Sequence, residues 1–108
     1  MDTDGPFGCS VEAALSVIGG RWKAVILFKL MEKNVLRFGE LQKEIPEVRQ
    51  RMLTNQLREL ESSGIVNREI YPVVPPKVEY SLTEYGKTLR PILLAMRDWG
   101  AEHQEKLD

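Results

Sequence analysis

Side chains that could contact DNA bases gather in residues 49–58. The apolar residues Met52, Leu53 and Leu57 recur there at a spacing that predicts an amphipathic helix with one face in a core. On the outward face this leaves Gln50, Arg51, Thr54, Asn55 and Arg58. Arginine can bond guanine through two acceptors, glutamine and asparagine can pair with adenine, and threonine can meet a thymine methyl group. The pattern therefore predicts a base-reading surface, with an ordinary solvated helix face as the alternative.

A second group of basic and aromatic side chains could contact phosphates or form part of a DNA-binding hairpin. These residues lie near helix starts, in a short strand and around a proline-rich tip: Arg21, Lys23, Arg37, Arg49, Arg68, Tyr71 and Lys77. Phosphate contacts position a protein on the duplex, whereas contacts to base edges read its sequence. The alternative is a hairpin that only packs against the core and carries exposed charges for solubility.

The charge is distributed unevenly along the chain. The formal net charge of −1 and the pI near 5.9 are low for a DNA-binding protein. Residues 1–12 and 98–108 together carry seven acids and one base, so residues 13–97 hold 14 of the 15 bases and 9 of the 16 acids. The central part of the chain is therefore basic, as expected for a region that faces phosphate.

The side chains needed for enzyme chemistry are missing. With one histidine, His103, and one cysteine, Cys9, the chain can form neither a catalytic triad nor a tetrahedral zinc site. It also lacks a glycine-rich phosphate loop. We therefore expect no enzymatic activity, no cofactor and no metal. The acidic start carries no export signal and no apolar run approaches the ~20 residues of a membrane span, so we expect a cytoplasmic protein without a membrane partner.

Hydrophobic periodicity and turn residues predict the elements that hold these side chains. Helices are expected over residues 11–18, 21–32, 39–45, 49–63 and 84–104, and strands over 37–38, 65–71 and 77–82. Ser10 and Thr83 are expected to cap the first and last helices, and Gly64 to end the fourth in the left-handed conformation. Pro91 is expected to kink the last helix.

This order of elements predicts an α+β, mostly helical protein with a winged helix-turn-helix fold. The helices over 39–45 and 49–63 form the helix-turn-helix, and the hairpin around residues 72–76 forms the wing. We expect residues 1–8 to be a flexible lead, and residues 9–108 to form one DNA-binding and dimerisation domain.

The last helix is predicted to pair two copies of the chain. About 20 helical residues span ~30 Å, which is longer than a compact winged helix can cover. The expected interface contains Val11, Leu15, Ile18, Leu89, Ile92, Leu93, Met96 and Trp99. A two-fold dimer would hold two recognition helices ~34 Å apart, which predicts a palindromic operator. The alternative is that the apolar stripe folds back onto its own domain.

Motifs in a fixed order along the chain resemble those of the HxlR-type transcriptional regulators, a bacterial winged-helix family related to the MarR type. The matching segments include Ile18-Gly19-Gly20-Arg21-Trp22, Arg37-Phe38-Gly39-Glu40-Leu41 and Pro75-Pro76-Lys77-Val78-Glu79-Tyr80. The resemblance implies a homodimeric DNA-binding repressor or activator that often answers to electrophiles or oxidants. Two departures, Glu47-Val48-Arg49 before the recognition helix and Lys33-Asn34-Val35-Leu36 without the usual glycine, leave the operator sequence open.

Cys9 is a candidate redox sensor, because the resemblance implies a sensing cysteine here in some family members. A position before a helix N-terminus favours the reactive thiolate, whereas Glu12 opposes it. The alternative is a small buried apolar residue. For the whole chain, the alternative function is a winged helix that contacts proteins and does not bind DNA.

Overall fold

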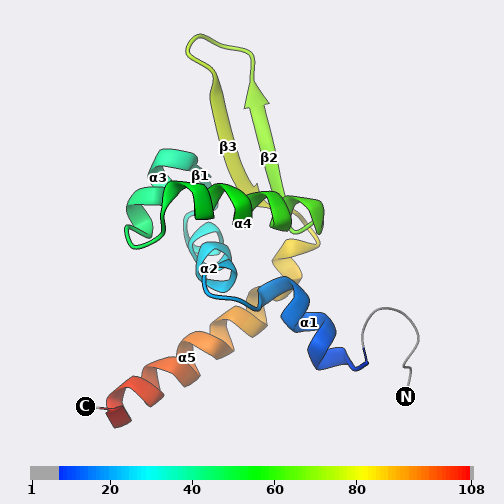
Figure 1. The fold of residues 1–108 in the computed structure, drawn as a ribbon, viewed down its shortest axis with the longest axis vertical. Coiled ribbons are helices and arrows are strands. Elements are labelled where there is room, and N and C mark those ends of the chain that lie inside the picture. The colour runs from blue at the N-terminus through cyan, green and yellow to red at the C-terminus, as the bar shows by residue number, and fades with distance from the viewer. Residues whose placement is uncertain (1–7, 108) are drawn as a thin grey trace.

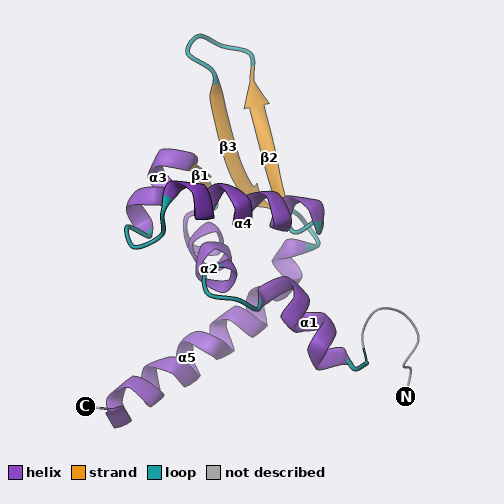
Figure 2. Ribbon diagram, in the orientation of Figure 1, coloured by secondary structure: helices purple, strands orange, loops and turns teal. Residues whose placement is uncertain are grey.

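The structure, a computed structural model, describes residues 8–107. Within that range the chain forms five α-helices, one short 3-10 helix and three strands (Figure 1; Figure 2). In order these are α1 Ser10–Ile18, α2 Lys23–Lys33, β1 Val35–Arg37, α3 Phe38–Glu44, α4 Gln50–Ser62, β2 Val66–Tyr71, β3 Lys77–Leu82, η1 Gly86–Leu89 and α5 Arg90–Leu107. Apart from Gly8, the predicted flexible lead lies outside the described residues. Among the described helices, none is long and apolar enough to cross a membrane.

The hydrophobic core lies between α2 and the helix-turn-helix. Helix α2 buries Ile26, Leu27 and Leu30, and the next helices add side chains at three- and four-residue spacing. The remaining buried apolar residues are Leu36, Leu41, Ile45, Val48, Leu53, Leu57, Leu60, Ile65, Val66 and Leu93. Because three leucines of α4 enter this core, the rotation of α4 about its axis is set by packing.

The three strands form an antiparallel sheet in the order β1-β3-β2. Strand β1 is short, with Leu36 opposite Tyr80, whereas β2 and β3 pair over their whole length from Val66 opposite Leu82 to Tyr71 opposite Lys77. The hairpin of β2 and β3 extends beyond the helices, and α5 leaves the opposite side of the molecule (Figure 1). The predicted winged helix-turn-helix with a long C-terminal helix is confirmed.

The end of α4 follows the prediction made from its glycine. Gly64 has φ +77°, and the N–H of Ile65 donates to the carbonyl of Leu60 at 3.0 Å. A left-handed residue after a helix turns the chain so that its last carbonyls are satisfied. This turn directs the chain from α4 straight into β2, which places the wing next to the recognition helix.

Three predicted helix starts are corrected. The N-cap of α1 is Cys9, and Ser10 is the first helical residue. Helix α2 begins at Lys23 and not at Arg21, because the chain turns at Gly20, where φ is +89°. Phe38 belongs to α3, where it was expected to be extended.

The last helix also differs from the prediction. Thr83 accepts a hydrogen bond from the N–H of Gly86, the first residue of the 3-10 helix η1, at 2.9 Å, so it lies before η1 and does not cap α5. Helix α5 begins at Arg90, which makes Pro91 a first-turn residue. Proline is tolerated there because the first N–H groups of a helix have no intrahelical partner. In place of the kink expected at Pro91, the chain changes from the 3-10 helix η1 to the α-helix α5 between Leu89 and Arg90.

Candidate nucleic-acid interface

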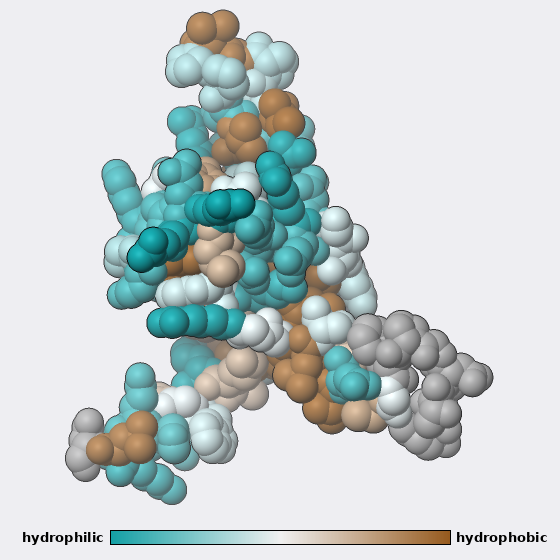
Figure 3. Space-filling view, in the orientation of Figure 1, coloured by the Kyte–Doolittle hydropathy of each residue, from teal (hydrophilic) through white to brown (hydrophobic). Residues whose placement is uncertain are grey.

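Helix α4 presents all five predicted base-reading residues on one open face. Leu53, Leu57 and Leu60 point into the core, each at most 2% exposed. The opposite side carries a shallow hollow whose lining is Gln50, Arg51, Thr54, Asn55 and Arg58. Hydrophilic side chains cover this side of the molecule in the space-filling view (Figure 3). The hollow holds hydrogen-bond donors and acceptors but no acid, which suits contact with the edges of base pairs.

Thr54 is the least free member of the reading face. Its hydroxyl donates to the carbonyl of Gln50 at 2.9 Å, a local bond that threonine commonly makes inside helices. The side chain is half-buried, so its methyl group and its remaining oxygen lone pairs are what it can offer a base.

The turn before α4 is held by two residues that the sequence analysis did not assign to the core. Val48 is 2% exposed and fills the core between α3 and α4. The side-chain amide of Gln42 donates to the carbonyl of Val48 at 2.5 Å, which ties α3 to the turn. Met52, expected in the core, is 41% exposed instead. The spacing of Leu41, Ile45 and Val48 carried the signal, because Val48 continues the apolar line of α3.

The basic residues predicted to contact bases or phosphates differ in whether an acid already neutralises them. Within residues 8–107, Arg49, Arg51 and Arg58 make no ion pair, and all three are exposed. Lys23 in contrast lies 2.7 Å from the carboxylate of Glu59, and its side chain is only 14% exposed. The unpaired arginines therefore carry most of the positive charge that α4 and its N-terminus present to solvent.

The cations of the wing are also paired with acids, one on α4 and one within the hairpin. Arg68 lies 3.2 Å from Glu61 of α4, and Lys77 lies 3.5 Å from Glu79. The ammonium group of Lys77 is 4.6 Å from the centre of the Tyr71 ring, a cation–π contact. Hydrogen bonding to the Glu79 carboxylate raises the pKa of the Tyr71 hydroxyl above its ordinary value.

Acids on the wing were missed in the sequence analysis. Glu69 and Glu79 face each other across β2 and β3, an unfavourable like-charge pair. The tip is apolar, with Val74 99% exposed. The strands of the wing therefore offer a phosphate less net attraction than α4 does.

Arg21 and Arg37 make local contacts that do not involve the reading face. The guanidinium of Arg21 sits 4.8 Å from the centre of the Trp22 ring. Arg37 is the N-cap of α3, and its backbone N–H donates to the Glu40 carboxylate at 2.8 Å. Both side chains are exposed and can move without disturbing the core.

An apolar surface on α1 and α5 is left uncovered in the single chain. Helix α1 has no buried residue, and Val11 and Leu15 are 67% and 55% exposed. On α5 the side chains of Ile92, Met96 and Trp99 are also exposed. An open hollow on α5 is lined by Pro91, Ile92, Ala95, Met96 and Trp99. We call these α1 and α5 residues the apolar face.

One predicted interface residue is corrected, and two others are partly covered by their own chain. Leu93 is 2% exposed and belongs to the core. Ile18 and Leu89 are half-buried against the same core. On α5, only the side of the apolar stripe that carries Leu93 faces α2, so neighbouring apolar residues of the same helix differ in burial. The exposed His103 stacks on Trp99, with 5.0 Å between the ring centres.

Cys9 is exposed in the single chain, so the interpretation of a buried structural cysteine is wrong for it. As the N-cap of α1, it lies beside the apolar face. The Glu12 carboxylate accepts a hydrogen bond from the N–H of Gly8 at 2.6 Å, which holds a negative charge at the same helix start.

Comparison with known proteins places these features among regulators. Residues 17–108 match the family described as HxlR-like helix-turn-helix. The uncharacterised regulator YdeP of Bacillus subtilis (strain 168) is 52% identical over 101 residues, which are 94% of this chain and 78% of YdeP. The redox regulator HypR in its reduced form superposes with a TM-score of 0.86 at 52% identity, covering 92% of this chain and 97% of that one.

A more distant solved structure has the same fold. A transcriptional regulator of the MarR family from Porphyromonas gingivalis W83 gives a TM-score of 0.82 at 34% identity, over 91% of this chain and 95% of the other. These relatives are described as regulators, YdeP and the Porphyromonas gingivalis protein as transcriptional regulators, and not as enzymes.

Proposed function

The chain belongs to the HxlR-like helix-turn-helix family of transcriptional regulators, and we propose that it acts in the cytoplasm by binding duplex DNA as a homodimer. The observation that carries this proposal is the reading face of α4. Its five polar side chains line one open hollow, and the described part of the chain does not cover them. The width of the major groove admits such a helix, with its first turns at the base edges.

The unpaired arginines support DNA over a protein partner. Arg51 and Arg58 line the hollow and Arg49 is the N-cap of the same helix, so this surface is positively charged although the chain as a whole carries a net charge of −1. A surface of this kind attracts a polyanion, whereas the acids of both chain ends lie elsewhere in the sequence. A winged helix that only contacts proteins does not require an acid-free reading face.

Dimerisation is supported by the apolar face. Exposed Trp99, Met96 and Ile92 on α5 lie on a helix of 18 residues that leaves the body of the domain (Figure 1). Large apolar patches on soluble proteins commonly mark interaction sites, and two-fold packing is the commonest way to cover one. A two-fold dimer would present two α4 helices to successive turns of the same duplex.

Selection from a pool of random duplex DNA tests the function. We expect enriched fragments that contain an inverted repeat, with half-sites about one helical turn, ~34 Å, apart. The selection repeated with Arg51→Ala should relax the base preference at one position of each half-site. The binding free energy for the original sequence should weaken by ~1–3 kcal/mol. Arg68→Ala is the matched control, because Arg68 is already paired with Glu61. No enrichment, together with no binding to random duplex at low salt, would favour a protein-binding module.

A redox response through Cys9 is a second proposal. It is supported by the exposure of this thiol at the start of α1 and by the similarity to HypR, a redox regulator with solved oxidised and reduced forms. Since the chain has one cysteine, oxidation to a disulfide needs a second thiol, either Cys9 of the other protomer or a small thiol.

Diamide treatment tests this response. Diamide takes up two electrons and two protons while two thiols join in a disulfide. We expect a cross-linked dimer on a non-reducing gel, or a mixed disulfide when glutathione is present, and a changed affinity for DNA. Cys9→Ser should abolish the product. The absence of any cross-link or adduct, with unchanged DNA binding, would overturn the proposal.

A further inference from the structure

One ion pair joins the recognition helix α4 to the wing. Glu61 lies in the last turn of α4, and its two carboxylate oxygens are 3.2 and 3.5 Å from Nε of Arg68 in β2. Strand β2 begins beside the C-terminal end of α4, because the chain turns at Gly64 (Figure 1). Within residues 8–107, no other ion pair connects α4 with the wing.

A second arginine and a tyrosine lie near this pair. Arg58 precedes Glu61 by about one helical turn and also lines the hollow of the reading face. Tyr80 is directly opposite Arg68 in the register of β2 and β3, so both side chains lie on the same face of the wing. Burial raises the pKa of the Tyr80 hydroxyl, and the charge of Arg68 lowers it. Glu61 and Arg58 act on the same hydroxyl in opposite directions, so the three charges gather around one ring.

The carboxylate of Glu61 limits what Arg68 can offer to DNA. Both side chains are partly exposed, Arg68 by 42% and Glu61 by 36%, so a phosphate can reach the arginine. An exposed ion pair is weak and can open. When it opens, however, the carboxylate stays beside the arriving phosphate and repels it. The net attraction of the pair for a phosphate is therefore small, whether the pair is open or closed.

We propose that Glu61 is a specificity-determining residue, because it withholds the charge of Arg68 from phosphates. The attraction to DNA then comes mainly from the unpaired arginines on α4 and at its N-terminus, next to the side chains that contact bases. This inference rests on the proposed function, since it concerns how the chain discriminates among duplexes.

A free Arg68 would strengthen binding to random DNA more than binding to an operator. Binding to random DNA depends on phosphate contacts, whereas discrimination needs contacts to base edges. On random DNA the protein can shift to a register in which a phosphate lies beside Arg68. On an operator the base contacts of α4 fix one register, so Arg68 cannot choose its phosphate. Glu61 therefore lowers the affinity for random DNA more than the affinity for the operator.

The salt dependence of binding to random duplex DNA tests the release of Arg68. In Glu61→Gln the neutral amide no longer cancels the guanidinium, so one more arginine in each protomer can contact a phosphate. The slope of log affinity against log salt should become steeper by about 1.8 for a dimer, and the affinity at about 50 mM salt should rise about tenfold or more. If Glu61 only held the wing in place, its loss would lower the affinity. An unchanged slope or a lowered affinity would overturn the proposal.

Two variants separate Arg68 from a general effect of charge. Glu69→Gln is the matched control, because Glu69 follows Arg68 in β2, points to the opposite face of the wing and makes no ion pair within the described residues. It should leave the slope nearly unchanged. The double variant Glu61→Gln, Arg68→Gln should return the slope to that of the unchanged protein. A control as steep as Glu61→Gln, or a double variant that stays steep, would overturn the proposal.

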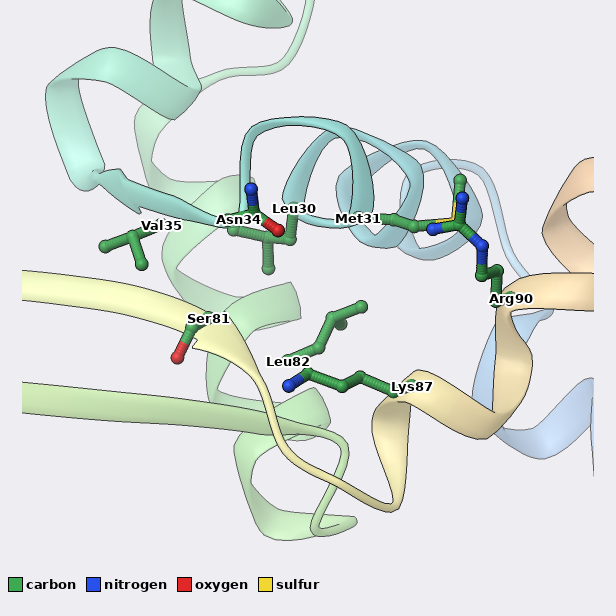
Figure 4. Close-up of a pocket in the computed structure, with 8 residues that line it drawn as sticks. All are labelled: Leu30, Met31, Asn34, Val35, Ser81, Leu82, Lys87 and Arg90. Atoms are coloured by element: carbon green, nitrogen blue, oxygen red, sulfur yellow. The ribbon is translucent and has the colours of Figure 1, made fainter.

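Glu84→Gln is a second control, since it frees a cation at a different place. Lys87 pairs with Glu84 at 2.9 Å and lines a cleft beside α2 together with Arg90 and Ser81 (Figure 4). That cleft shares no lining residue with the hollow of the reading face. The release of Lys87 should therefore leave the slope nearly unchanged. If Glu84→Gln steepened the slope as much as Glu61→Gln, any freed cation would act alike and the proposal would be overturned.

The specificity itself is measured with selected and random duplex DNA side by side. The ratio of the two affinities should fall about threefold or more in Glu61→Gln, because the gain on random DNA is the larger one. A ratio that does not fall would overturn the proposal. If the unchanged protein binds no duplex at low salt, the proposed function fails and this inference fails with it. If the unchanged protein selects an inverted repeat and Glu61→Gln behaves in the same way, only this inference fails.

Discussion

Arg58→Gln should reduce the salt dependence of DNA binding by an amount that can be worked out from the ion pairs. Three arginines around the reading face of each protomer, Arg49, Arg51 and Arg58, lack an ion pair within the described residues. We expect each of them to lie close enough to a phosphate to neutralise it, in addition to any contact with a base, so that the six arginines of a dimer neutralise six phosphates. At a slope of about −0.9 per phosphate, log affinity against log salt should fall with a slope of about −5. Removing Arg58 from both protomers should change the slope to about −3.5.

The expected difference is large enough to measure. Between 50 and 200 mM salt, a slope of about −5 lowers the affinity roughly 10³-fold, whereas about −3.5 lowers it roughly 10²-fold. Fluorescence anisotropy with a labelled random duplex over a sodium chloride series gives both slopes. Arg68→Gln is the control, because Glu61 already neutralises Arg68 at 3.2 Å. If Arg58→Gln leaves the slope unchanged while Arg68→Gln reduces it, the assignment of phosphate contacts from ion pairing is wrong.

Three further predictions concern assembly, packing and pH. Trp99→Glu should raise the dissociation constant of the dimer about 100-fold or more, because it replaces an apolar ring that is 68% exposed in the single chain with a charge at the proposed interface. Analytical ultracentrifugation would measure this constant. Ile70→Glu, which makes the same kind of change at an exposed apolar residue of the wing, should have no effect. Gly86→Ala should lower the free energy of unfolding by about 2–3 kcal/mol, because a Cβ would overlap the carbonyl oxygen of Ile65, whereas the Cβ of Gly39→Ala meets nothing within 4 Å; urea unfolding of both variants would contradict this if their losses were equal. Burial raises the pKa of Tyr80, although the charge of Arg68 opposes this. The protonated hydroxyl therefore stabilises the folded protein fully below about pH 10, and this stabilisation is lost as the pH rises through the folded-state pKa. The fall in unfolding free energy above about pH 10 should be smaller in Tyr80→Phe, and identical pH profiles of the two proteins would refute this.

Local patterns were sufficient to predict the elements and the reading face. Leucines at three- and four-residue spacing in α4 lie on one face of the helix, and that face packs in the core. The polar residues of the opposite face therefore point outward, namely Gln50, Arg51, Asn55 and Arg58. Gly64 and the proline-rich tip marked the ends of α4 and β2 in the same way, because φ above zero and the missing proline N–H restrict local geometry. For the same reason the errors at Ser10, Arg21 and Phe38 are small shifts at helix starts.

Long-range contacts were beyond such patterns. Lys23 and Glu59 are far apart in sequence, so nothing near Lys23 reveals that its charge is already paired. Leu93 and Met96 belong to one apolar stripe, yet only the packing of α5 against α2 decides that Leu93 is buried and Met96 exposed.

The sequence by itself thus determined which residues form helices, strands and an outward polar face, since these depend on periodicity and backbone conformation over a few residues. The tertiary structure decided which cations keep a free charge, which apolar residues stay uncovered, and that Arg90 and Lys87 share a cleft with Ser81. The physical reason is that charge neutralisation and burial depend on neighbours in space, and those neighbours are chosen only when the elements pack together.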